Sequence, residues 1–68
     1  MGDEDLLTYR QRQVIELIAD GCTNAQIADR LGIKEDTVKN HLNAVRYKLT
    51  ASNRAHIIAI LFRKGELV

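Results

Sequence analysis

A chain of 68 residues is too short to divide its core between two domains, because a smaller core could not offset the conformational entropy of folding. The apolar fraction of 46%, the absence of proline and the single cysteine favour one helical domain and exclude a disulfide-linked scaffold and a cysteine-based zinc site. The net charge is only +1, but residues 1–5 hold three of the nine acidic residues, so residues 6–68 carry ten basic and six acidic residues, a net of +4. We expect an acidic lead at 1–5 and one domain at 6–68.

The first two predicted helices, at about 8–20 and 24–31, begin with the same pattern. Thr8 and Gln11 are three residues apart, as are Thr23 and Gln26, and this spacing is typical of a capping box. Apolar residues then recur at helical spacing, and each helix is followed by a glycine suited to a left-handed stop.

The third and fourth helices are expected at about 35–49 and 53–64. Apolar residues form a narrow stripe on the third helix, at Val38, Leu42, Val45 and Leu49, so most of its surface must face water or a partner. Ser52 is the expected cap of the fourth helix, whose segment 57–62 is apolar on all sides. Because a soluble chain seldom exposes a large apolar surface, we expect a homodimer interface there. Its residues would be Ala55, Ile58, Ala59 and Phe62. In the alternative, the extra apolar side packs on the acidic tail or is simply exposed.

The connection between the second and third helices indicates a helix-turn-helix. Segment 31–34 is short and contains a glycine, and the small Ala28 lets the two backbones approach closely. The predicted fold class is therefore all-α, a four-helix helix-turn-helix domain. The single Cys22 is expected to be a small apolar filler, which fits an intracellular, reducing location.

The polar face of the third helix predicts DNA reading. Asn40 and Asn43 lie one turn apart and can each offer a bidentate pair to adenine, while Lys39 can reach guanine or a phosphate. Thr23 and Asn24 stand at a helix start with free backbone N–H groups, which suits a phosphate oxygen. Further basic candidates for phosphate contact are Arg10, Arg12, Lys34, Arg46, Lys48 and Arg54.

Two histidines and a tyrosine have alternative interpretations. His41 borders the apolar stripe and either donates to a phosphate or is a partly buried structural residue. Tyr47 lies nearer the helix end, within reach of a sugar or phosphate. His56 has no companion at metal-ligand spacing, so we expect a structural or interfacial role and no metal site.

Four segments closely resemble the LuxR/FixJ-type helix-turn-helix domain, also called GerE-like, of bacterial regulators. They are Leu-Thr-Tyr-Arg-Gln-Arg-Gln-Val at 7–14, Gly-Cys-Thr-Asn-Ala-Gln-Ile-Ala at 21–28, and Thr-Val-Lys-Asn-His-Leu at 37–42 followed by Lys-Leu at 48–49. The resemblance implies that the third helix enters the major groove and the fourth pairs in a dimer. By position it assigns base reading to Lys39, Asn40 and Asn43, and phosphate contact to Thr23, Thr37 and His41. Lys34 departs from the family pattern, where a Ser or Thr usually caps the third helix.

We therefore expect a bacterial transcriptional regulator, and not an enzyme, that binds a near-palindromic double-stranded DNA site as a dimer. It would be cytoplasmic and nucleoid-associated, without a membrane segment, cofactor or bound small molecule, with RNA polymerase as a further partner. The family's usual amino-terminal receiver or ligand-binding domain is not in the sequence, so the chain is either an excised fragment or similar to the stand-alone members of the family. Of these two, we expect a stand-alone regulator.

Two other functions stay open at this point. One is a promoter reader like the fourth region of sigma factors, which shares the helix-turn-helix and the opening Leu-Thr-x-Arg pattern, although His41 and the complete fourth helix argue against it. The other is a protein-interaction module, an antagonist that pairs with a related regulator through the fourth helix.

Overall fold

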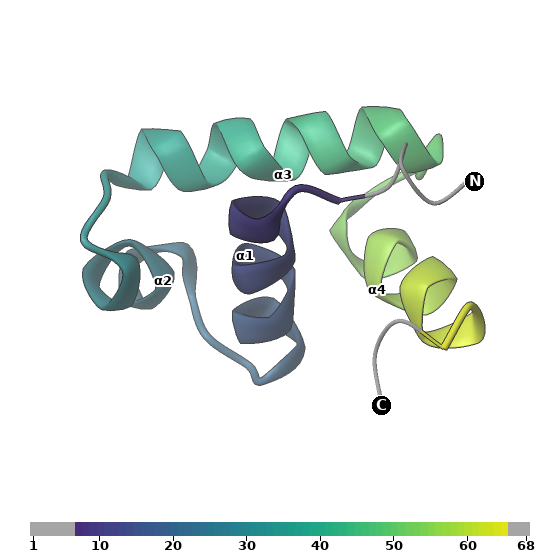
Figure 1. Ribbon diagram of the computed structural model, residues 1–68, viewed down its shortest axis with the longest axis horizontal. Helices are drawn as coiled ribbons and strands as arrows, with labels where there is room; N and C mark the ends of the chain where they lie inside the picture. Colours follow the sequence, from purple (N-terminus) through teal and green to yellow (C-terminus); the bar gives the residue numbers. More distant parts are fainter. Residues whose placement is uncertain (1–6, 66–68) are drawn as a thin grey trace.

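The computed structural model describes residues 7–65, and these fold into four α-helices (Figure 1). The helices are α1 (Tyr9–Ala19), α2 (Asn24–Leu31), α3 (Glu35–Leu49) and α4 (Arg54–Arg63). The predicted all-α class is confirmed, and each helix agrees with its expected range to within one residue at either end. The acidic lead predicted at 1–5 lies outside the described residues.

Capping boxes start α1 and α2, as the sequence predicted. The Thr8 hydroxyl accepts from the Gln11 backbone N–H at 3.1 Å, and Gln11 Oε1 accepts from the Thr8 N–H at 3.1 Å. Thr23 and Gln26 repeat the exchange at 3.1 and 2.9 Å. Gly32 ends α2 with a φ of 69°, a left-handed conformation that glycine adopts without steric cost. Each box satisfies N–H groups that a helix start would otherwise leave without a partner.

Both ends of α3 lack the usual cap residue. Lys34 precedes the helix and makes no capping side-chain hydrogen bond, so the carboxylates of Glu35 and Asp36 in the first turn are left to stabilise the positive helix start. At the other end Thr50 takes a left-handed conformation, with a φ of 54°, and its N–H donates to the Tyr47 carbonyl oxygen at 3.2 Å.

The start of α4 corrects one expectation, because Asn53 and not Ser52 caps the helix. The Asn53 side chain accepts from the His56 N–H at 2.9 Å. In return, His56 Nδ1 accepts from the Ser52 backbone N–H at 2.9 Å. Asparagine caps as well as serine does, and the returning bond from the imidazole favours the register that begins one residue later. The Nδ1 atom of His56 therefore has a structural role at the start of α4.

The core consists of two apolar clusters on either side of α1. Cluster one lies beneath α2 and the first half of α3, and its buried residues are Val14, Cys22, Ile27, Ala28 and Val38. Cluster two lies beneath α4, and its buried residues are Ile15, Val45, Ala51, Ile57 and Leu61. Ile18 and Leu42 are half-buried and pack against both clusters. Cys22 is a buried free thiol in cluster one, which confirms its expected role as an apolar filler.

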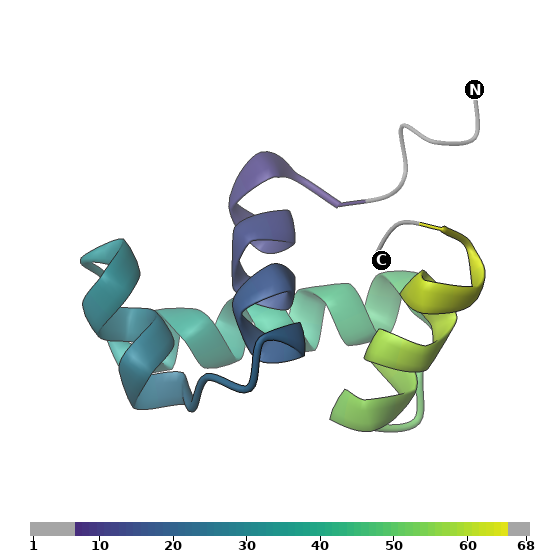
Figure 2. The same cartoon turned by 90° about the horizontal axis from the view of Figure 1, so that it is seen from below.

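The longest helix, α3, crosses the other three. In Figure 1 it spans the top of the molecule with α1, α2 and α4 below it, and Figure 2 shows the same three helices from below with α3 behind them. The described helices therefore cover one side of α3 and leave the opposite side bare. None of the helices within residues 7–65 has the length and hydrophobicity needed to cross a membrane.

Candidate nucleic-acid interface

The bare side of α3 carries the three predicted base-reading residues. Lys39, Asn40 and Asn43 are all exposed, and within residues 7–65 none of the three side chains is hydrogen-bonded. Val38 and Val45 are fully buried on the opposite side, and these two contacts fix the rotation of the helix about its axis. The structure thus places a lysine and two amides together on a surface where their donors and acceptors are available to a ligand.

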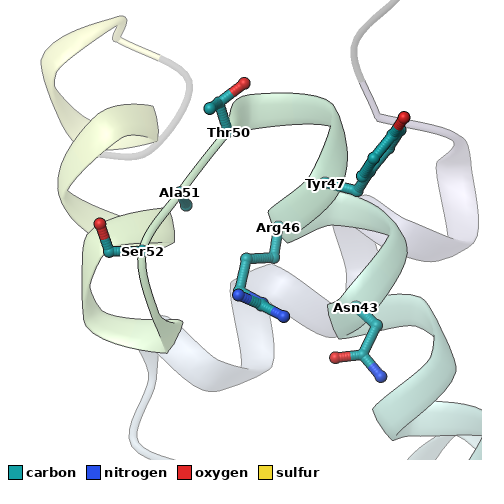
Figure 3. Close-up of a pocket in the computed structure, with 6 residues that line it drawn as sticks. All are labelled: Asn43, Arg46, Tyr47, Thr50, Ala51 and Ser52. Atoms are coloured by element: carbon teal, nitrogen blue, oxygen red, sulfur yellow. The ribbon is translucent and has the colours of Figure 1, made fainter.

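A surface pocket lies at the corner where α3 meets α4 (Figure 3). Its volume is about 750 Å³, and it is lined by Asn43, Arg46, Tyr47, Thr50, Ala51 and Ser52. Arg46 is exposed and extends its guanidinium into the hollow between α3 and the turn at 50–52 (Figure 3). Tyr47 extends from α3 in a different direction from Arg46 (Figure 3), with 88% of its surface exposed. The lining thus combines one cation with amide, phenol and hydroxyl groups, which suits a sugar-phosphate backbone.

Lys48, predicted as a phosphate contact, also has a structural contact that the sequence did not reveal. Its Nζ donates to Gln11 Oε1 at 2.8 Å, and the same oxygen serves the capping box of α1. Gln11 is 93% buried, so this contact ties the last turn of α3 to the first turn of α1.

The predicted phosphate contacts at the start of α2 are close to a residue of α4. Thr23 is exposed, and although its oxygen accepts from Gln26, its hydroxyl hydrogen remains a donor. Asn24 is half-buried and its Oδ1 accepts from Arg54 Nη1 at 2.7 Å. Arg54 Nη2 donates at 3.3 Å to the Cys22 carbonyl oxygen. The two bonds from Arg54 join residues about thirty positions apart, and sequence reasoning missed them.

Two further phosphate candidates, Thr37 and His41, lie on α3. Thr37 and His41 are half-buried, one helical turn apart, on the same helix as the base-reading residues. Partial exposure leaves part of each side chain accessible to a ligand.

The outer surface of α4 is apolar but not uniformly exposed. Phe62 is 62% exposed and Ala55 is exposed, whereas Ile58 and Ala59 are half-buried. Ile58 also packs against cluster two, so it belongs partly to the core. The four residues predicted for a dimer interface nevertheless share one face of α4, because their spacing follows the helical repeat.

The described residues hold no cluster with an obvious chemical activity. Within 7–65, no three histidine, cysteine, aspartate or glutamate side chains are close enough to hold a metal ion. The surface features of this part of the chain are the polar side of α3, its flanking cations and the apolar side of α4.

Comparison with known proteins gives one consistent result. Residues 5–61 match the family described as "Bacterial regulatory proteins, luxR family". The chain is 42% identical over 62 residues to the spore germination protein GerE of Bacillus subtilis, covering 91% of this chain and 84% of GerE. A solved structure of the transcription factor GerE superposes with a TM-score of 0.87 at 37% identity, covering 91% of this chain and 92% of that one.

Longer regulators also match. The chain is 48% identical over 54 residues to the probable transcriptional regulatory protein SgaR of Hyphomicrobium methylovorum, and 41% identical over 59 residues to the transcriptional regulatory protein DesR of Bacillus subtilis. It spans only 26% and 30% of these two proteins, respectively.

Proposed function

This chain belongs to the LuxR family of bacterial regulatory proteins, and from that premise we propose that it reads the major groove of DNA with α3. As a member it is a non-enzymatic, DNA-binding transcriptional regulator with the four-helix GerE-like fold. The observation that carries the proposal is the side of α3 that no described helix covers. There Lys39, Asn40 and Asn43 are exposed without intramolecular partners in the described chain.

The chemistry of these three residues matches base edges. A carboxamide such as that of Asn40 or Asn43 pairs through two hydrogen bonds with adenine N6 and N7, and a lysine such as Lys39 donates to guanine O6 and N7. Since each side chain projects from one rigid helix, each would read a fixed position in the half-site. This set would supply sequence preference.

Phosphate contacts would fix the orientation of α3 in the groove. The proposed residues are Thr23, Asn24, Thr37, His41, Arg46 and Lys48. The first four lie at the start of α2 and in the first half of α3, and the two cations lie near the end of α3. Contacts at both ends of the reading helix favour binding across the groove, because phosphates border it on two strands.

The active unit would be a homodimer joined through α4. Support comes from the apolar face formed by Ala55, Ile58, Ala59 and Phe62, where a large aromatic ring is mostly exposed. Two-fold symmetry would place the two α3 helices at half-sites about 34 Å apart, so the target would be a near-palindrome. Residues 6–68 would form the DNA-binding domain, acting at the nucleoid in the bacterial cytoplasm.

Selection of bound duplexes from a randomised DNA pool at near-physiological salt tests the proposal. An enriched inverted repeat is expected, and Asn40→Ala should relax the preference at one base pair per half-site, at a cost of about 1–3 kcal/mol on the preferred site. Lys39→Ala should also weaken the selected site, whereas Lys64→Ala removes one exposed cation from the end of α4 and serves as the matched control.

Two outcomes would refute parts of this proposal. Equal loss of affinity on every sequence for Asn40→Ala would remove base reading from that residue. No enrichment for the wild type, together with pairing to a related regulator through α4, would support the antagonist function that the exposed Phe62 also favours.

A further inference from the structure

Arg54 connects two surfaces that the proposed function uses separately. It is the first residue of α4, the proposed dimer helix, and its side chain reaches the start of α2, the proposed phosphate-binding end. One guanidinium nitrogen donates to Asn24 Oδ1 at 2.7 Å and the other to the Cys22 carbonyl oxygen at 3.3 Å. We call this pair of bonds the Arg54 bridge.

The position of Arg54 is electrostatically unfavourable for its own helix. The amino-terminal end of a helix carries partial positive charge, so a cation in the first turn is destabilising. The first turn of α4 contains no acidic residue that would compensate. Neither acceptor of the Arg54 bridge is an anion, because one is a carboxamide and the other a backbone carbonyl. Neither partner therefore neutralises the positive charge of the guanidinium, which lies beside the start of α2.

The Arg54 bridge also determines which atoms of Asn24 are available. Its oxygen is occupied by a charged donor, which leaves the two N–H donors of the same amide for another acceptor. Thr23, the adjacent cap residue, retains its hydroxyl hydrogen, and the first backbone N–H groups of a helix have no partner within the helix. All of these groups donate, and a phosphate oxygen only accepts.

We propose that Arg54 is a positioning residue for DNA binding, which orients the Asn24 amide toward a backbone phosphate without touching the phosphate itself. This inference rests on the proposed DNA-binding mode. It assigns to α4 a part in the placement of the phosphate-binding end of α2, in addition to dimer formation.

A double-mutant cycle on the selected DNA site tests the proposal. Arg54→Met and Asn24→Ala should each weaken binding by about 3- to 10-fold, the value of one good hydrogen bond. Because Arg54 acts through Asn24, the double variant should bind nearly as well as the weaker single variant. Arg54→Lys retains the charge but lacks the planar pair of donors, so it should not restore the affinity.

Asn24→Asp separates positioning from simple structural support. An aspartate keeps an oxygen acceptor for Arg54, so the unfolding temperature should stay at or above that of the wild type. Its negative charge replaces the two N–H donors, so DNA affinity should fall further than for Asn24→Ala. This variant keeps the proposal testable if Arg54→Met fails to fold.

Other results would overturn the inference. Losses that multiply in the double variant, or full affinity in Arg54→Lys, would show that Arg54 contacts a phosphate directly. Unchanged DNA affinity for Asn24→Asp would show that the Arg54 bridge is only structural. These results require a wild type that binds its selected site, whereas a wild type that binds no DNA refutes the proposed function itself.

Discussion

The left-handed turn at the end of α3 predicts a stabilising substitution, Thr50→Gly. Among residues 7–65, Thr50 is the one residue other than glycine with a positive φ, 54°. That conformation costs an L-residue roughly 1–2 kcal/mol, because Cβ approaches the following carbonyl oxygen. Glycine removes this cost but has more conformational freedom to lose on folding, about 0.5–1 kcal/mol. We therefore expect Thr50→Gly to raise the free energy of unfolding by about 0.5–1 kcal/mol.

The substitution Thr50→Gly changes the cost of the left-handed conformation without removing a hydrogen bond that closes the turn. Thr50 is exposed, and the hydrogen bonds that close the turn are made by backbone atoms, including the Ala51 N–H that donates to the Arg46 carbonyl oxygen at 2.9 Å. Glycine preserves all of these atoms. In a domain of this size, 1 kcal/mol corresponds to about 4–8 °C in unfolding temperature, so circular dichroism melting resolves the change.

Thr50→Ala is the matched control, because alanine keeps the Cβ atom and with it the steric cost. Its unfolding temperature should stay near that of the wild type. If Thr50→Gly and Thr50→Ala shift the unfolding temperature equally, or if Thr50→Gly lowers it, backbone strain is not stored at this turn and the reasoning fails.

Three further predictions concern the turn at Gly32 and the two proposed functional surfaces. Gly32→Ala should lower the free energy of unfolding by about 1 kcal/mol in urea titrations, purely through φ, because an added Cβ would meet no atom within 4 Å; an unchanged midpoint would contradict this. Arg46→Ala should weaken binding to all DNA sequences alike and reduce the slope of log affinity against log salt by about 1, and a sequence-dependent loss would argue against a phosphate contact. Phe62→Asp should shift sedimentation toward the monomer while the helical circular dichroism signal stays intact, and an unchanged dimer would place the interface elsewhere.

The helices were predictable because their start and stop signals are local. The two capping boxes each span only four residues, and the apolar stripe of α3 follows the helical repeat, so the polar side of α3 with Asn40 and Asn43 could also be deduced. At the start of α4, two neighbouring residues could both cap. The imidazole of His56 favours Asn53 over Ser52, and the cap preferences alone could not show this.

The contacts between distant segments were not predictable from one sequence. Arg54 to Asn24 and Lys48 to Gln11 join residues 30 and 37 positions apart, and no periodicity connects such pairs. The segment 57–62 of α4 was ambiguous for a different reason. A helix that is apolar on all sides gives no indication of which side is buried, so the half-buried state of Ile58 emerges only from the packing.

The division of the core at α1 has a consequence for how such a sequence can diverge. Cluster one supports α3 against α2, and cluster two supports α4. Among residues 7–65, only Ile18 and Leu42 pack against both clusters. Substitutions that reshape cluster two alter the outer surface of α4 while leaving the packing around Val38 in place. The proposed subunit pairing and the proposed base preference can therefore change by separate mutational steps. If both proposals hold, a duplicated copy of this gene can acquire a new partner while it still recognises the old DNA site.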